Sequence, residues 1–201
     1  MQVTKFTNHD EWLAARSGKI TGSKLKDILT KRGNSVKIGV YQLAADKLGI
    51  QDGSVDGRDR GHELEAEAIE ALSKETGIDF QTDLVMWHDE ENPNIAYSPD
   101  GYTEDHTVTA EAKCLSSAHH IQITVEKRIL NEHYDQMIQS FIVNDKQQTH
   151  YYVSYDPRVT SHPVTIIKTE REDVEGVVEA YRASEQAVLD RVDEIIESLA
   201  F

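Results

Sequence analysis

Two carboxylates and a lysine near the middle of the chain have the types and spacing for metal-dependent hydrolysis. Asp100 stands in the segment Ser98-Pro99-Asp100-Gly101, and Glu111-Ala112-Lys113 follows in the next predicted strand. Residues i and i+2 of a strand share a face, so Glu111 and Lys113 point the same way and Ala112 points the opposite way. A hairpin from Asp100 to Glu111 would bring the two carboxylates together beside the lysine.

Such a group predicts phosphodiester hydrolysis. Two carboxylates, a backbone carbonyl and water molecules are the hard oxygen ligands that Mg²⁺ and Mn²⁺ prefer. A metal ion there lowers the pKa of a bound water and offsets charge on a phosphate, and a lysine can orient that water or stabilise the phosphate. The motif is short, however, and a turn aspartate followed by an exposed Glu/Lys pair on a strand would give the same pattern. Glu104 and Asp105 are expected to be solvated residues at the tip of the loop.

The surrounding segments predict an α/β protein with a mixed central sheet flanked by helices. Residues 1–77 are expected to be helical, with amphipathic spacing at 23–31, 41–48 and 62–76. Gly49 and Gly77 follow the last two of these segments and are typical helix ends. Short apolar stretches predict strands at 84–87, 95–97, 107–114, 150–155 and 164–167, and further helices are expected at 117–130, 133–143 and 171–200.

The net charge of −15 is unusual for a protein that binds nucleic acid, because such proteins generally carry a basic patch. The charge is unevenly distributed. Residues 1–60 contain 11 Lys and Arg against 7 Asp and Glu, whereas residues 61–201 contain 10 against 29. A basic N-terminal face could meet phosphates while the acidic remainder keeps the protein soluble, although such asymmetry is also common in proteins without a nucleic-acid partner.

The length of 201 residues predicts a single domain, residues 1–201, with enough core to fold without disulfides. Cys114 is the only cysteine, which excludes an internal disulfide and any site built from several cysteines; it is expected to pack as a small apolar side chain. The sequence has no apolar stretch of about 18 residues and no signal-peptide pattern at its start. We therefore expect a cytoplasmic protein with no membrane partner.

Four further segments accompany the core motif. Residues 12–23 read W-x-x-x-R-x-G-x-I-T-G-S, residues 60–65 read R-G-x-x-x-E, Gln136 lies in a predicted helix, and residues 155–158 read Y-D-P-R. Their types and order, with the core motif, resemble the phage lambda exonuclease family, the YqaJ-type viral recombinases among the PD-(D/E)xK nucleases. The resemblance covers roughly residues 10–200 and implies a restriction-endonuclease-like core. The single cysteine excludes the iron–sulfur branch of that superfamily, which needs four.

The resemblance implies a role for each matched residue at the hydrolytic centre. Lys113 would activate or orient the attacking water, and Gln136 would reach that water or the lysine, with Gln139 a weaker candidate. The implied metal ligands are Asp100, Glu111, Glu65 and the carbonyl of Ala112. A solvated glutamate at position 65 and an ordinary polar residue at position 136 of an amphipathic helix are the structural alternatives.

A second implied site is a pocket for a 5′-terminal phosphate, formed by Arg16, Thr21, Ser23 and Ser98. Arginine offers a bidentate fork to phosphate oxygens, hydroxyls add donors, and the N-terminus of a helix favours an anion. The alternative is a surface arginine beside a serine that caps a helix. Trp12 is expected in the core.

The implied activity is that of a Mg²⁺-dependent 5′-to-3′ exonuclease on double-stranded DNA ends, with Mn²⁺ able to replace Mg²⁺. It would release mononucleotides and leave a 3′ single strand for a single-strand DNA annealing protein in phage recombination, working as a ring-shaped homotrimer. A PD-(D/E)xK endonuclease or junction resolvase is the main alternative. A catalytically inactive DNA-binding module is a second, against which the intact Asp100, Glu111 and Lys113 argue.

The nine histidines do not favour a zinc site. His119 and His120 are the most suggestive pair, but adjacent residues on a helix diverge by about 100° and cannot easily share one metal. We expect both at the surface or facing DNA.

Overall fold

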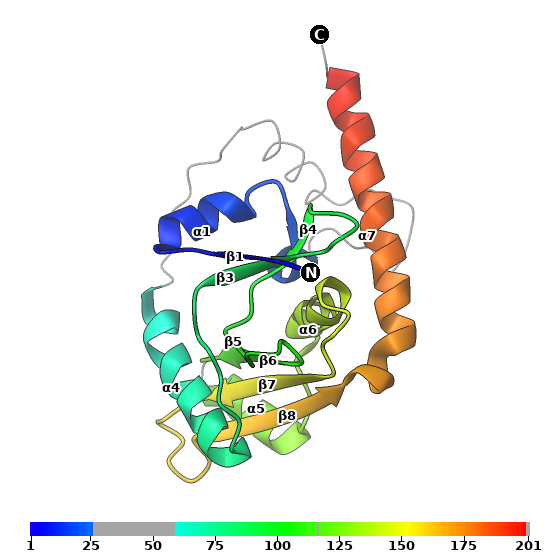
Figure 1. Cartoon of the computed structure of the whole chain (residues 1–201). Coiled ribbons are helices and arrows are strands. Elements are labelled where there is room, and N and C mark those ends of the chain that lie inside the picture. The colour runs from blue at the N-terminus through cyan, green and yellow to red at the C-terminus, as the bar shows by residue number, and fades with distance from the viewer. Residues whose placement is uncertain (26–58, 116, 200–201) are drawn as a thin grey trace.

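The computed structural model describes residues 1–25, 59–115 and 117–199. The predicted helix at 41–48 and most of the one at 23–31 lie outside these residues. The described part is a mixed α/β structure with two four-stranded sheets and flanking helices (Figure 1). The predicted α/β class is therefore confirmed, and the strands divide between two mixed sheets.

The first sheet has the strand order β1-β3-β4-β2. Its strands are β1 (Gln2–Lys5), β2 (Ile20–Thr21), β3 (Val85–His88) and β4 (Ile95–Tyr97). β2 runs parallel to β4, and the other pairs are antiparallel. The expectation that residues 1–77 are helical was wrong for β1 and β2. Both are short, and β1 is exposed along its length, so pairing with β3 and β4 defines them rather than a local pattern.

The second sheet has the order β5-β6-β7-β8 and carries the core motif. β6 and β7 are parallel neighbours, in a register that places Glu111 opposite Tyr152 and Ala112 opposite Val153, whereas the outer pairs are antiparallel. The three strands predicted for this part of the chain are present as β6 (Val108–Lys113), β7 (Thr149–Tyr155) and β8 (Val164–Glu170). The short edge strand β5 (Gly101–Tyr102) was not predicted.

The helices begin and end close to the predicted limits. α4 is followed by Gly77 at φ +71, a left-handed conformation that glycine adopts without strain. α5 stops short of the predicted residue 130 because Lys127 adopts a positive φ of 51, with which a right-handed helix cannot continue. The described elements are α1 (His9–Arg16), the 3₁₀ turn η1 (Gly22–Lys24), α4 (Asp59–Thr76), α5 (Ser117–Glu126), α6 (Asn131–Val143) and α7 (Arg171–Leu199).

The two faces of the second sheet have different partners. Ala110, Ala112 and Val153 pack with α4, whereas Tyr152 packs with Ile123 of α5. Because side chains alternate along a strand, Glu111, which lies between these two alanines of β6, and Lys113 point away from α4. The predicted division, with Glu111 and Lys113 on one side and Ala112 on the other, is therefore what the structure has.

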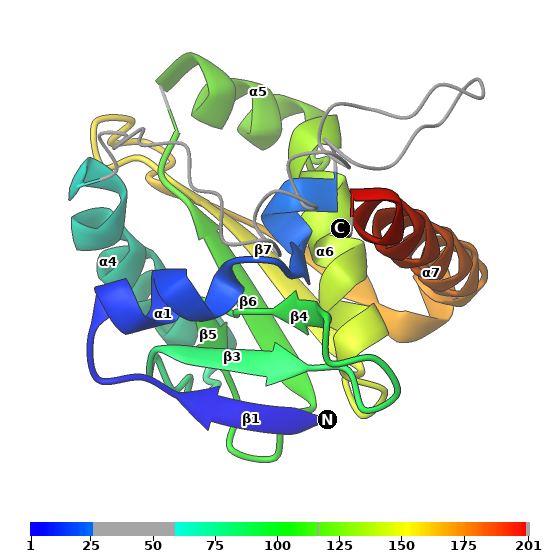
Figure 2. The same cartoon turned by 90° about the horizontal axis from the view of Figure 1, so that it is seen from above.

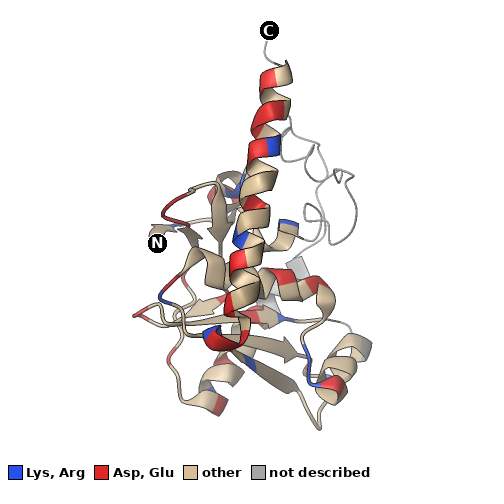
Figure 3. Cartoon of the chain, turned by 90° about the vertical axis from the view of Figure 1, so that its right-hand side faces the viewer, with Lys and Arg blue, Asp and Glu red and all other residues tan. Residues whose placement is uncertain are grey.

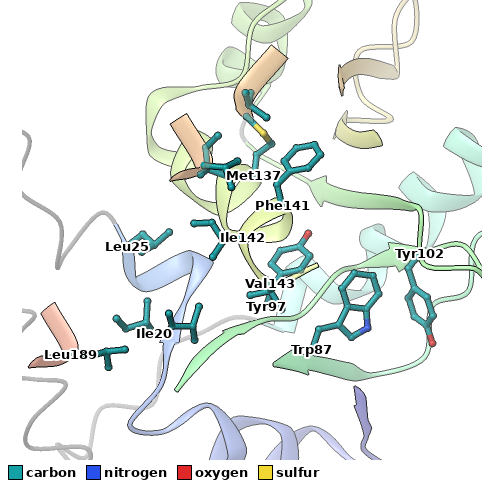
Figure 4. Packing of buried hydrophobic residues seen from close by; sticks show 14 of the residues in the cluster. Ile20, Leu25, Trp87, Tyr97, Tyr102, Met137, Phe141, Ile142, Val143 and Leu189 are labelled. Carbon is teal, nitrogen blue, oxygen red and sulfur yellow. The ribbon is translucent and has the colours of Figure 1, made fainter. Parts of the chain in front are cut away.

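The largest core cluster joins the first sheet to α6 and α7 (Figure 4). α6 packs against both β4 and α7, and it lies between them in Figure 2. Trp87 and Tyr97 pack edge to face with ring centroids 6.2 Å apart, and Phe141 is fully buried in the same cluster. Burying a large apolar side chain contributes about 1.5–3 kcal/mol, so this cluster holds the end of β4 firmly against α6.

α7 carries much of the negative charge of the chain. Its 29 residues include nine Asp and Glu but three Arg and no Lys, and Figure 3 shows the acidic residues spread along the whole helix. Within the described residues no helix combines the length and apolar character needed to span a membrane.

Candidate active site

Asp100 is held against β6 at the start of the β5–β6 hairpin. Its backbone N–H donates to the carbonyl of Ala110 at 3.1 Å, and its Oδ2 accepts a hydrogen bond from the N–H of Ala112 at 2.8 Å. The antiparallel pairing of Gly101 with Ala110 fixes this arrangement. The hairpin thus brings Asp100 and Glu111 to the same end of the sheet, as their spacing predicted.

Glu111 is 3% exposed and accepts hydrogen bonds on both carboxylate oxygens. Tyr97 donates its hydroxyl to Oε2 at 3.1 Å, Lys113 donates Nζ to Oε1 at 2.5 Å, and Gln136 donates Nε2 to the same Oε1. A buried carboxylate requires such donors to replace lost water. Burial raises the pKa of Tyr97, and Glu111 raises it further, so the phenol remains a donor.

The charges of the site favour an added cation. Burial raises the pKa of Asp100 well above its ordinary value, and the nearby Glu111 carboxylate raises it further while Lys113 opposes. Burial lowers the pKa of Lys113, but the attraction of Glu111 and Asp100 outweighs it, so the net shift is upward and the ammonium stays charged. Two carboxylates that repel each other in a buried site form a pair that a divalent cation would stabilise.

A cavity of about 410 Å³ gathers the predicted hydrolytic residues: Glu65, Asp100, Glu111, Lys113 and Gln136 all line it. Within the described residues no group of three or more His, Cys, Asp or Glu is close enough to hold a metal ion. Glu65 projects from α4 into this cavity, and its charge adds to the rise in the pKa of Asp100. Its role as a metal ligand stays a prediction.

The two carboxylates and the backbone carbonyl of Ala112 are the groups here that could hold a metal ion. The N–H of Ala112 points at Asp100, and in an extended strand the carbonyl of the same residue leaves the strand on the same edge. Hard oxygen donors of this kind suit Mg²⁺ or Mn²⁺.

The predicted phosphate pocket is centred on Arg16. Its guanidinium donates Nη1 to Ser98 Oγ at 3.2 Å and Nη2 to Ser23 Oγ at 3.0 Å and Thr21 Oγ1 at 3.3 Å. Arg16, Ser23 and Ser98 line the same cavity as the carboxylates. Thr21 is buried and does not line this cavity, so its hydroxyl helps to hold the Arg16 side chain in position.

Trp12 is part of this pocket and not of the core, contrary to expectation. It is half-buried and lines the cavity. Its indole N–H donates to Ser98 Oγ at 3.1 Å, and the guanidinium of Arg16 lies 4.3 Å from its ring centroid. The i, i+4 spacing of Trp12 and Arg16 on α1 places both on one helix face, a signal that could have assigned the tryptophan to the pocket.

The surface position expected for the histidine pair was wrong for His120. His119 is exposed, but His120 is fully buried. The Nδ1 of His120 lies 2.8 Å from Ser154 Oγ, and its Nε2 lies 2.7 Å from the carbonyl oxygen of His162. These contacts tie α5 to β7 and to the loop before β8, so His120 has a structural role away from the cavity.

The sequence left Gln136 and Gln139 as alternatives, and the two have different surroundings. Gln136 lines the cavity and reaches Glu111, whereas Gln139 is fully buried and donates to the carbonyl of Ala96 at 3.3 Å. As expected, Cys114 is partly buried against the α4 cluster. Burial, with Glu65 adding to it, raises the pKa of the Cys114 thiol to about 12.

The fold and this cavity together define a nuclease with a PD-(D/E)xK-type core. The family model of the YqaJ-like viral recombinase domain matches residues 11–147, and the chain belongs to that family.

Solved structures agree with this assignment. The alkaline exonuclease LHK-Exo from Laribacter hongkongensis matches with a TM-score of 0.81 at 27% identity, over 95% of this chain and 96% of that chain. LHK-Exo in complex with dAMP matches with a TM-score of 0.80 at 28% identity and the same coverage. A phage-related exonuclease from Haemophilus somnus 129PT has a TM-score of 0.65 at 15% identity over 90% and 96% of the two chains, which supports the fold alone. A search of curated proteins gave no match.

Proposed function

We propose that this protein is a divalent-metal-dependent exonuclease that degrades double-stranded DNA from its 5′ ends. The observation that carries the proposal is one cavity lined by both Asp100, Glu111 and Lys113 and by the Arg16 pocket. A guanidinium surrounded by hydroxyls suits a terminal phosphate, which accepts several charge-assisted hydrogen bonds. A pocket for the end of a strand beside a hydrolytic centre favours cleavage from that end.

The residues present fit Mg²⁺, with Mn²⁺ as a substitute because it shares the preference for oxygen ligands. Asp100, Glu111 and the carbonyl of Ala112 would hold the ion, and Glu65 would complete the acidic set. When bound, the ion supplies an acidified water and neutralises charge on the scissile phosphate. Lys113 and the amide of Gln136, which both contact Glu111, would donate to the attacking water or to a phosphate oxygen.

The 5′-to-3′ polarity and mononucleotide product rest on the Arg16 pocket and on the relatives. LHK-Exo binds dAMP, and a similar product in this chain would leave a 3′ single strand on the duplex. We propose that a single-strand DNA annealing protein receives this strand during phage-type recombination.

A homotrimeric ring would explain how a chain of net charge −15 stays on DNA. Topological linkage replaces part of the affinity that phosphate contacts normally supply. The native mass in solution tests the assembly: a mass of three chains supports it, and a monomer with unchanged processivity contradicts it.

Digestion of end-labelled duplex tests the activity. With Mg²⁺, a 5′ label should be released early and a 3′ label late, EDTA should stop both, and a covalently closed circle should stay intact. Cutting of the circle would instead favour an endonuclease or junction resolvase. DNA binding without hydrolysis in either metal would favour an inactive binding module.

A further inference from the structure

Tyr97 is a buried tyrosine whose hydroxyl reaches a carboxylate of the candidate active site. It ends β4, is 1% exposed, and packs edge to face on Trp87. Its hydroxyl donates to Oε2 of Glu111 at 3.1 Å, while Lys113 and Gln136 both contact Oε1. In the described part of the chain, Tyr97 is thus a donor to the second oxygen of this carboxylate.

The backbone around Tyr97 is held from two sides. Within the first sheet, Tyr97 pairs with Trp87 and Ala96 with His88. From α6, Gln139 donates its Nε2 to the carbonyl of Ala96 at 3.3 Å. The phenol ring is therefore fixed in place by both the sheet and the helix, and its hydroxyl is a fixed point that Glu111 must meet.

We propose that Tyr97 is a positioning residue that fixes the orientation of the Glu111 carboxylate for metal binding. This inference rests on the proposed function of Glu111 as a metal ligand. Without the hydroxyl, the contacts at Oε1 would remain, but the carboxylate could rotate about its last bond. Groups that orient metal ligands typically change metal affinity or activity by about 10–100-fold when they are removed.

Tyr97→Phe is the variant that tests this, because it removes one oxygen and keeps the ring in the core. Tyr102→Phe is the matched control. Tyr102 is 2% exposed, packs 5.6 Å from Trp87, and donates its hydroxyl to Asp83 at 3.3 Å, outside the proposed ligands. Mn²⁺ binding to the DNA-free protein, measured by electron paramagnetic resonance, gives a readout independent of catalysis. The Mg²⁺ concentration for half-maximal hydrolysis gives a second.

We expect Tyr97→Phe to weaken Mn²⁺ binding and to raise the half-saturating Mg²⁺ concentration, each by about tenfold. Tyr102→Phe should match the wild type in both. Unchanged metal binding in a folded Tyr97→Phe protein would overturn the inference. So would a Tyr97→Phe protein that no longer unfolds cooperatively, because the hydroxyl would then serve stability.

Failure of this inference is distinguishable from failure of the proposed function. A wild-type protein that binds no Mn²⁺ and ignores Mg²⁺ would contradict the metal-dependent nuclease, and the inference would fall with it. A wild-type protein that responds to both metals, alongside an indistinguishable Tyr97→Phe, would contradict the role of Tyr97 alone.

Discussion

Gly22 packs directly against Gln136. A Cβ atom on Gly22 would come within 2.9 Å of Gln136 Cγ and 3.1 Å of Gln136 Cα, closer than side chains normally approach. η1 carries Ser23 of the Arg16 pocket and contacts α6 at Gln136, the residue that reaches Glu111. The glycine allows the proposed phosphate pocket and the hydrolytic centre to lie side by side.

We expect Gly22→Ala to lower the rate of DNA hydrolysis by about 10²-fold, because the methyl group would displace Gln136 or η1 and small displacements at a site have effects of that size. The control is Gly176→Ala on α7, where a Cβ meets nothing within 4 Å. Initial rates on linear duplex measure the effect. A Gly22→Ala protein as active as the control would show that this contact does not matter for catalysis.

Arg16→Lys should abolish the preference for 5′-phosphorylated over 5′-hydroxyl ends. Lysine keeps the charge but cannot reproduce the fork that contacts Ser23 and Ser98. Losing one or two charge-assisted hydrogen bonds implies a fall in the preference of at least about tenfold. The measurement compares rates on the two duplexes, with Lys19→Ala as the control for a nearby cation that contacts the Pro93 carbonyl. If Arg16→Lys kept the preference for 5′-phosphorylated ends, the proposal that Arg16 binds the terminal phosphate would be contradicted.

The buried Glu185 predicts a pH-dependent stability. Burial raises its pKa from 4.5 to about 8, against the opposing effects of Gln139 and Arg182, while Asp89 adds to the rise. The folded state thus binds the proton more tightly than the unfolded chain. The stabilisation that comes from protonating Glu185 is complete below pH 4.5 and is lost as pH rises through about 8. Between these values the free energy of unfolding falls by up to about 1.4 kcal/mol per pH unit.

Glu185→Gln removes this titration and keeps the size of the side chain. The Tm of the wild type should fall more steeply than that of Glu185→Gln as pH rises from about 5 to about 8. Thermal unfolding across that range measures the difference. Parallel curves for the two proteins would mean that Glu185 has no raised pKa in the folded state.

The hairpin that carries the chemistry was predictable because its signals are local. Alternation along a strand predicted that Glu111 and Lys113 lie on one side of β6. The turn after the strand at 95–97 predicted a hairpin that brings Asp100 beside Glu111. Resemblance to a family added Arg16 and Gln136, which lie far from the hairpin in the chain and line the same cavity.

The remainder depends on contacts between distant parts of the chain. His120 is buried because its side of α5 meets β7, and nothing in the neighbouring residues reveals which side that is. The roles of Tyr97 and Gly22 could not be predicted for the same reason. In the sequence, Tyr97 resembles a core residue of a strand and Gly22 resembles a loop glycine. Their importance comes from Glu111 and Gln136, which only the folded structure brings to them.

The most direct test of the central claim is hydrolysis of linear duplex DNA by Asp100→Asn, compared with Asp105→Asn. Asp105 is an exposed carboxylate at the tip of the same hairpin, and it accepts hydrogen bonds from the hydroxyls of Thr103 and Thr107. We predict that Asp100→Asn releases no nucleotide in Mg²⁺ while Asp105→Asn matches the wild type. Full activity of a folded Asp100→Asn protein would contradict the assignment of this cavity as a nuclease active site.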